Sequence, residues 1–195
     1  MRHFILPTLL AGLLCACTTT PAGPLDAEAR FDEALSVAAS WHSQSKAMAK
    51  KVMEEYGPPD QILSDLLVWN SIGPWRKIAV WDTEDYGFSD RGGPDTLEQT
   101  LSYAVPRDKR KDLADFSDEI SVSKEGDEVS VRGNSEALNF LVLNLAHEIV
   151  QGAKDPADAR LFYDRVCQLS QAGKSSPYTQ GLLFSPREQP LPPQL

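Results

Sequence analysis

The sequence predicts an α+β domain in which an antiparallel sheet of about five strands packs against helices. Two observations carry this prediction. Segments of alternating hydrophobicity lie in the middle of the chain, between residues 66 and 131, whereas the strongest helical patterns flank them. Short turn sequences join two pairs of these segments, which is typical of antiparallel hairpins. The expected order is a helix, a hairpin, a single strand, a second hairpin and two helices.

The first part of this domain is a helix that leads into a hairpin. Residues 45–56 carry apolar side chains at four-residue intervals, and a glycine followed by two prolines ends the helix. A weaker amphipathic pattern over residues 26–41 predicts a helix. This helix either belongs to the domain or extends the flexible segment that precedes it. The β-rich runs 66–69 and 75–81 predict a hairpin with a turn of four or five residues within 70–74.

The sheet continues after an acidic, glycine-containing loop at residues 82–94. Residues 97–105 alternate as a third strand, which Pro106 ends. Residues 107–116 can form a short helix. Alternation resumes on both sides of Gly126, which predicts the second hairpin.

Two helices close the predicted domain. The longest apolar pattern follows Asn134 or Ser135, either of which can cap a helix that would lie across the sheet. Gly152 ends this helix. An Asp-Pro pair then starts a last helix, which keeps its period until Gly173. We therefore place the domain at residues 26–173.

The N-terminus has the pattern of an export signal. A positive start precedes an apolar run that is too short to span a bilayer. Residues 14–17, Leu-Cys-Ala-Cys, resemble the lipobox of bacterial lipoproteins, although Cys15 replaces the usual Ser, Ala or Thr of its second position. The resemblance implies that residues 1–16 are a signal peptide and that Cys17 is the acylated N-terminus. The alternatives are a secretory signal cleaved after Ala16 without lipidation, or an uncleaved hydrophobic anchor.

The lipobox resemblance also implies a location. Residues 17–25 would be a flexible tether, and two or more acyl chains on Cys17 would anchor the protein stably to a membrane. Thr18, where some lipoproteins have Asp, resembles lipoproteins that are passed to the outer membrane of Gram-negative cells. We expect the domain at the periplasmic face of that membrane.

Charge excludes one class of partner. The chain has 28 acidic and 19 basic side chains, a net charge of −9, without the clustered Lys and Arg that bind phosphate, so no nucleic-acid partner is expected. Loss of the signal peptide would remove Arg2 and make the net charge −10. Anionic headgroups would repel such a surface, so acyl chains would have to hold it. No disulfide is expected, because Cys15 would leave with the signal and Cys17 would be acylated.

The helix after Ser135 carries the weak catalytic candidates. Asn144, His147 and Glu148 share its polar face at i, i+3 and i+4, and a histidine beside a carboxylate could perform acid–base chemistry. The simpler interpretation is that they form the solvated side of an amphipathic helix. A zinc-protease motif would need a second histidine where Gln151 stands, so neither a metal nor another cofactor is expected.

Four further features invite interpretation. Trp69, Trp75 and Trp81 lie on one hairpin, where they either form an exposed binding face or pack as core. The acidic loop lacks EF-hand spacing and is expected to be solvated. Residues 174–195 are predicted to be a proline-rich disordered tail, and Cys167 to be a small hydrophobe on the last helix.

Residues 53–59, Met-Glu-Glu-Tyr-Gly-Pro-Pro, lead into Leu-Val-Trp at 67–69 and Ile-Ala-Val-Trp at 78–81. This segment resembles the helix, Gly-x-Pro and hairpin unit of outer-membrane lipoproteins of the BamE/SmpA type over residues 45–82. The resemblance implies a domain without catalytic residues that assists a β-barrel assembly complex through protein contacts. The additional strand, hairpin and helices depart from that family. The chain is also similar to uncharacterised bacterial lipoproteins that share its Tyr-Gly-x-Pro-Asp, Gly-Pro-Trp and Asn-Phe-Leu-x-x-Asn-Leu motifs.

We therefore expect a membrane-anchored envelope lipoprotein with a periplasmic protein-interaction domain and no catalytic activity. Its partners would be the membrane, through the acyl chains on Cys17, and another envelope protein. The alternative is a small-molecule-binding protein or hydrolase that uses the polar face around His147.

Overall fold

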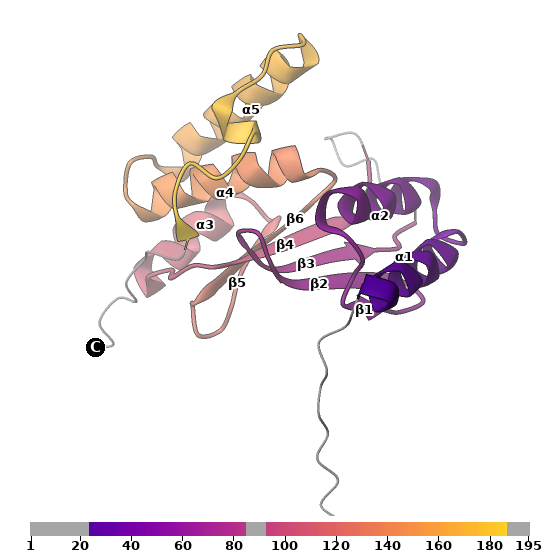
Figure 1. The fold of residues 1–195 in the computed structure, drawn as a ribbon. Coiled ribbons are helices and arrows are strands. Elements are labelled where there is room, and N and C mark those ends of the chain that lie inside the picture. The colour runs from indigo at the N-terminus through magenta and orange to yellow at the C-terminus, as the bar shows by residue number, and fades with distance from the viewer. Residues whose placement is uncertain (1–23, 85–92, 187–195) are drawn as a thin grey trace, which may run out of the picture.

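A six-stranded antiparallel sheet with helices packed against it forms the body of the molecule (Figure 1). The computed structural model describes residues 24–84 and 93–186. The strands lie in the order β1-β2-β3-β4-β6-β5, and each neighbouring pair is antiparallel. The predicted α+β class is confirmed, with six strands in the described sheet instead of about five.

Two helices precede the strands, a short helix interrupts them, and two long helices follow. The elements are α1 (Pro24–Ala38), α2 (Ser43–Tyr56), β1 (Gln61–Ile62), β2 (Leu66–Ile72), β3 (Trp75–Trp81), β4 (Leu97–Ser102), the 3₁₀ turn η1 (Arg107–Lys109), α3 (Arg110–Phe116), β5 (Ile120–Val122), β6 (Glu128–Gly133), α4 (Glu136–Val150), α5 (Pro156–Gln171) and the 3₁₀ turn η2 (Pro177–Thr179).

The two faces of the sheet differ in polarity. In β6 the side chains of Val129 and Val131 are buried, whereas those between them are partly exposed. The pairing register places the buried residues of adjacent strands on the same face, for example Leu101 opposite Val129. The other face carries polar pairs such as Lys77 and Glu98, whose Nζ and Oε1 atoms lie 2.8 Å apart. An antiparallel sheet with one face on the core alternates in this way.

Helices from both ends of the chain contribute to one core. α2 contacts β3, and α4 contacts β4 and β6. The ring of Trp75 stacks on Phe140 of α4 with centroids 5.4 Å apart, and Tyr56 at the end of α2 donates a hydrogen bond to Glu136 of α4. α5 lies above α4 in Figure 1 and packs against both α3 and α4.

Side-chain caps begin the two long helices where the sequence predicts them. The Ser135 hydroxyl accepts a hydrogen bond from the backbone N–H of Leu138, so Ser135 rather than Asn134 caps α4. The Asp155 carboxylate accepts one from Asp158, and Pro156 occupies the first turn of α5. These caps set the direction in which each helix leaves its loop.

The β2–β3 hairpin is tighter than predicted. Both strands extend to a two-residue connection, Gly73 and Pro74, instead of a turn of four or five residues. The positive φ angles of Ser71 and Gly73 make this tight reversal possible. The additional strand, β1, has only two residues, too few to give an alternating pattern.

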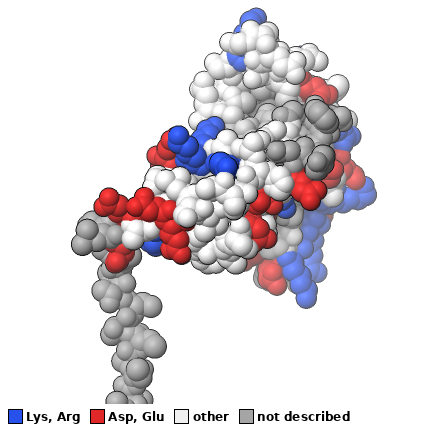
Figure 2. All heavy atoms as spheres, turned by 90° about the vertical axis from the view of Figure 1, so that its right-hand side faces the viewer, with Lys and Arg blue, Asp and Glu red and all other residues white. Residues whose placement is uncertain are grey.

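α1 belongs to the domain. Ala34 and Ala38 are buried in the common core, and Trp41 after the helix donates its indole N–H to the carbonyl of Ser64 at 2.7 Å. The opposite side of α1 is acidic, and Figure 2 shows acidic side chains gathered at this side of the molecule. The exposed carboxylates of α1 are those of Asp26, Glu28, Asp32 and Glu33.

The C-terminal segment departs most clearly from expectation. Residues 176–186, here called the strap, turn back after α5 and pass across α4 (Figure 1). Tyr178, Leu182 and Phe184 pack against the core. The prediction of a disordered tail is therefore wrong for this part, because three of its apolar side chains pack against the core. Residues 187–195 lie outside the described residues.

Candidate functional site

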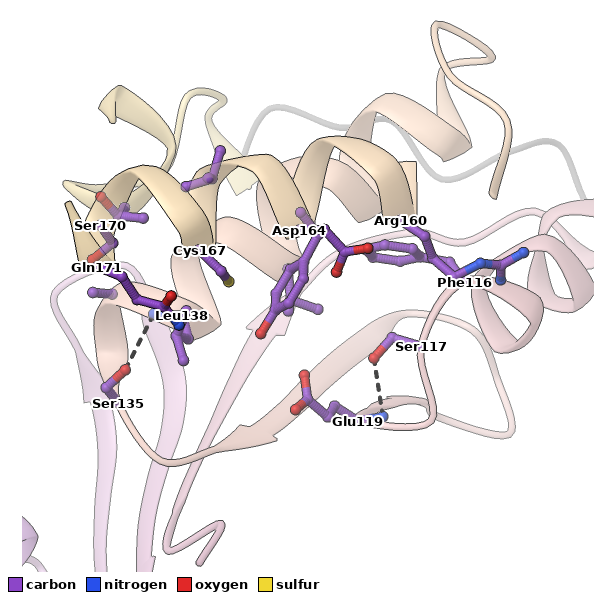
Figure 3. Close-up of a pocket in the computed structure, with 15 residues that line it drawn as sticks. Phe116, Ser117, Glu119, Ser135, Leu138, Arg160, Asp164, Cys167, Ser170 and Gln171 are labelled. Atoms are coloured by element: carbon purple, nitrogen blue, oxygen red, sulfur yellow. Dashed lines mark hydrogen bonds between the residues drawn. The ribbon is translucent and has the colours of Figure 1, made fainter. Parts of the chain in front are cut away.

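A groove lies under α5, between that helix and the segment that connects α3 to β5 (Figure 3). We call it the α5 groove, and its volume is about 700 Å³. Successive turns of α5 form its upper wall, and Cys167 points from there into the space. The opposite wall contains Ser117 and Glu119, and the start of α4 closes one end with Ser135 and Leu138.

The α5 groove combines an apolar floor with polar edges. Phe116, Val142 and Val166 line it and are buried, whereas Ser170 and Gln171 are exposed at its edge. A mixture of apolar surface and a few polar groups is typical of binding sites. Cys167 was expected to act as a small hydrophobe; it is half-buried and packs against the core.

The charges of the α5 groove are mainly carboxylates. Asp164 from α5 and Glu119 from the opposite wall face the groove (Figure 3). Arg160, the basic residue in its lining, donates a hydrogen bond to the backbone carbonyl of Asp115. The positive charge is thus held at one end, and the groove is suited to a ligand that brings a positive charge of its own.

The polar face of α4 holds the strap. The amide nitrogen of Asn144 donates to the carbonyls of Tyr178 and Gly181 at 3.1 and 2.9 Å, and its oxygen accepts from the N–H of Leu183 at 2.7 Å. Asn144 is buried, so these hydrogen bonds satisfy both ends of a desolvated amide. The sequence interpretation of this face as solvated is therefore wrong for Asn144.

His147 lies between two aromatic rings. Its Nδ1 atom is 2.8 Å from the hydroxyl of Tyr103, and its ring stacks on Phe184 with centroids 4.2 Å apart. Burial lowers the pKa of His147, and the nearby charge of Glu148 partly opposes that change. Burial also raises the pKa of Tyr103. The imidazole is therefore kept largely neutral near pH 7 and packs as an aromatic surface.

Glu148 is the third residue of α4 that contacts the strap. Its Oε1 atom accepts a hydrogen bond from the Tyr178 hydroxyl at 2.6 Å. Burial, together with this hydrogen bond, raises the pKa of Tyr178 to about 12. The Oε2 atom lies 3.7 Å from the ammonium group of Lys154. Asn144, His147 and Glu148 thus lie together on α4, and each of them makes at least one contact with the strap.

The three tryptophans do not form one surface cluster. Trp69 and Trp75 are each 1% exposed. The indole N–H of Trp69 donates to the carbonyl of Gly57, and that of Trp75 to the hydroxyl of Tyr56. The binding-face hypothesis is therefore wrong for these two, which pack as core. Trp81 is partly exposed, with the guanidinium of Arg132 5.3 Å from the centre of its ring.

A buried polar network, which sequence patterns did not identify, joins α2, β4 and α4. The Oε1 atom of Glu136 accepts hydrogen bonds from Tyr56 and Gln99, both at 2.6 Å. Gln99 in turn accepts one from Asn139 at 3.0 Å. Burial and the hydrogen bond to Glu136 raise the pKa of Tyr56. These side chains are involved in holding the helices on the sheet.

Other candidates lie partly outside the described residues. Cys17 is outside them, as are Asp85 and Asp90 of the acidic loop. Asp82 at the start of that loop accepts hydrogen bonds from the backbone N–H and the ring of His42. Within residues 24–84 and 93–186, no group of three or more His, Cys, Asp or Glu side chains is placed to hold a metal ion. Nor does any helix in these two ranges combine the length and apolar character needed to cross a membrane.

Comparisons with known proteins add no relative. The chain matches no protein-family model and no curated protein, and its fold matches no solved structure. Function must therefore be inferred from the residues and their geometry.

Proposed function

We propose that this chain is a lipid-anchored protein of the bacterial cell envelope whose domain binds a partner protein and does not perform catalysis. The anchor is inferred from the lipobox resemblance at residues 14–17. Six residues separate Cys17 from Pro24, where α1 begins. At about 3.5 Å per residue, this tether would hold the domain within about 25 Å of the acylated cysteine.

The surface of α1 supports anchoring by acyl chains. Its exposed carboxylates, Asp26, Glu28, Asp32 and Glu33, would lie near the membrane on so short a tether. Anionic headgroups repel carboxylates, so electrostatic adhesion would be unfavourable there. Two or more acyl chains provide stable anchoring without it.

The α5 groove is the observation that carries the binding role. It is open, its volume is about 700 Å³, and its floor is apolar. Asp164 and Glu119 face it from opposite walls. We assign to it a segment of a partner protein that places an apolar side chain on Phe116 and Leu138 and a Lys or Arg beside the carboxylate of Asp164.

The contacts of the predicted catalytic residues favour binding over catalysis. Both ends of the Asn144 amide and one carboxylate oxygen of Glu148 hold the strap. The His147 ring is covered by Phe184 on one face. A general base must be able to reach a substrate proton, and these contacts leave His147 poorly placed to do so.

Site-specific photocrosslinking in cells tests this proposal. A photoreactive residue in place of Ser170, at the edge of the groove, should give a discrete crosslinked species with one envelope protein. The same residue in place of Ser121, which is exposed on the edge strand β5, is the matched control and should not. Asp164→Lys should reduce the Ser170 adduct severalfold. Equal adducts from both positions, or an adduct insensitive to Asp164→Lys, would contradict the assignment.

A further inference from the structure

The contacts of the strap resemble those of a bound peptide. One side chain, Asn144, makes hydrogen bonds to three backbone groups between Tyr178 and Leu183. Contacts to backbone atoms accept many sequences, so they define the path of a peptide and not its composition. Selectivity would come from the two side chains at the ends of this path, Tyr178 and Phe184.

The two aromatic anchors occupy separate places, Tyr178 between α4 and α5 and Phe184 between α4 and Tyr103. The Tyr178 hydroxyl donates to Glu148, and the Tyr178 ring lies 4.7 Å from that of Phe162. Phe184 contacts both Tyr103 and His147, edge-on against the first at 5.4 Å and stacked on the second. Aromatic anchors in fixed positions are the usual energetic centres of a peptide interface.

The strap can leave its place without taking the sheet apart. None of the described strands pairs with it. It is joined to α5 through residues 173–175, which are exposed. Leu183, between the two anchors, is 55% exposed. Segments that lie outside the sheet and are joined through an exposed connection open at a lower free energy than core strands do.

The strap also leaves room at its seat. A hollow of about 230 Å³ remains between it and α4, lined in part by His147, Glu148 and Gln151. The Oε2 atom of Glu148 is buried and accepts no hydrogen bond from the described residues, although the ammonium group of Lys154 lies 3.7 Å from it. A ligand with a better fit could use this space and this acceptor.

We propose that Tyr103, Asn144, His147 and Glu148 form a peptide-binding site, that the strap is its tethered occupant, and that a partner segment with a tyrosine six residues before a phenylalanine competes for it. The site is distinct from the α5 groove and does not depend on the function proposed for that groove. A tether raises the local concentration of its ligand to about the millimolar range, so a free peptide must overcome that advantage. Binding in trans is therefore controlled by release of the strap.

Fluorescence anisotropy with a labelled peptide of residues 175–186 tests the site. The receptor is the full chain with Tyr178→Phe and Phe184→Ala, which weakens the tethered strap. We expect saturable binding to this variant and at least about tenfold weaker binding to the wild-type chain, whose own strap competes. Leu183→Ala is the matched control and should behave as wild type, because the Leu183 side chain is largely exposed.

Peptide variants test how the site reads its ligand. A peptide with Ser at positions 179, 180, 181 and 183, which keeps the core-packed Leu182, should bind almost as well as the original, because Asn144 contacts only the backbone of that stretch. A peptide that lacks both aromatic anchors should not bind. Asn144→Ala in the receptor should abolish binding of every peptide.

A second form of the protein is the control for misfolding of the Tyr178→Phe, Phe184→Ala variant. A specific protease site placed within residues 173–175 of the otherwise wild-type chain allows the strap to be cut after folding. The labelled peptide should then exchange with the cut strap in gel filtration, while the near-UV circular dichroism stays unchanged. Absence of peptide binding to both forms, or binding that survives Asn144→Ala, would overturn the proposal.

Discussion

Phe184 stacks on His147 with ring centroids 4.2 Å apart and ring planes 10° from parallel. The two residues are 37 positions apart in the sequence, and their contact fixes the end of the strap on α4. The same imidazole reaches the Tyr103 hydroxyl, so one histidine links the strap, α4 and the end of β4. This contact is the most informative place at which to perturb the strap.

Removal of the Phe184 ring should raise the pKa of His147. Burial lowers that pKa in the folded protein, so loss of the covering ring should return it toward the usual value of about 6.5. NMR titration of the imidazole in the wild-type chain and in Phe184→Ala measures the change. A pKa that is identical in the two proteins would contradict the stacking contact.

The lowered pKa of His147 also predicts that acid reduces the stability of the folded protein. A histidine whose folded pKa lies below its unfolded value of about 6.5 contributes stability above that pH and loses it as the pH falls through the folded pKa. Tyr103 and Phe184 contact the ring, and the charge of Glu148 acts on it. Urea unfolding at pH 7.5 and pH 5 should show a larger loss in the wild-type chain than in His147→Phe. An equal loss in both would assign the effect to other groups.

Tyr178→Phe should change stability in alkaline solution. Because the folded pKa of Tyr178 is raised to about 12, its contribution is complete below about pH 10 and is lost between pH 10 and 12. The wild-type chain should therefore lose more stability than Tyr178→Phe across that interval, as measured by urea unfolding at each pH. Parallel curves would contradict the hydrogen bond to Glu148.

The buried network predicts a stability loss for Tyr56→Phe. The change deprives Glu136 of one donor and leaves the indole N–H of Trp75 without its acceptor. Loss of a buried hydrogen bond with a polar group left unsatisfied costs about 1–3 kcal/mol of unfolding free energy. Glu55→Gln, exposed on the same helix, is the control and should stay within about 0.5 kcal/mol of wild type. Equal unfolding free energies for the two variants would contradict a stabilising role of the network.

Hydrogen exchange should separate the strap from the sheet. Asn144→Ala removes the acceptor of the Leu183 N–H, so that amide should exchange at least about tenfold faster. Amides of β3 and β4, which pair within the sheet, should be unchanged. Faster exchange throughout the sheet would show that the strap and the sheet unfold together.

Local signals predicted most of the fold. The caps at Ser135 and Asp155, and the glycine after α2, are read from neighbouring residues, and the structure has them where the sequence places them. β1 escaped prediction because two residues carry no period. The position of the hairpin turn was predicted correctly, but its predicted length was too great. The ends of the two strands beside Gly73 depend on pairing across the turn, which local sequence does not show.

The parts that the sequence did not predict depend on distant contacts. The strap contains prolines and polar residues, and it is ordered because Tyr178 and Phe184 meet partners on α4 that are 30 and 37 positions away. Gln99 and Asn139 have a polar composition that suggests exposure, yet they bind each other inside the core. Two aromatic and two leucine side chains within residues 178–184 were the available signal that this segment could pack.

Mass spectrometry of the N-terminal peptide of the mature protein, purified from its native membrane, tests the central proposal most directly. The account predicts a chain that begins at Cys17 and carries acyl groups on it, with residues 1–16 absent. It also predicts that Cys17→Ala no longer partitions into the membrane fraction. A mature chain that begins at an unmodified Cys17, or that retains residues 1–16, would contradict the lipid anchor.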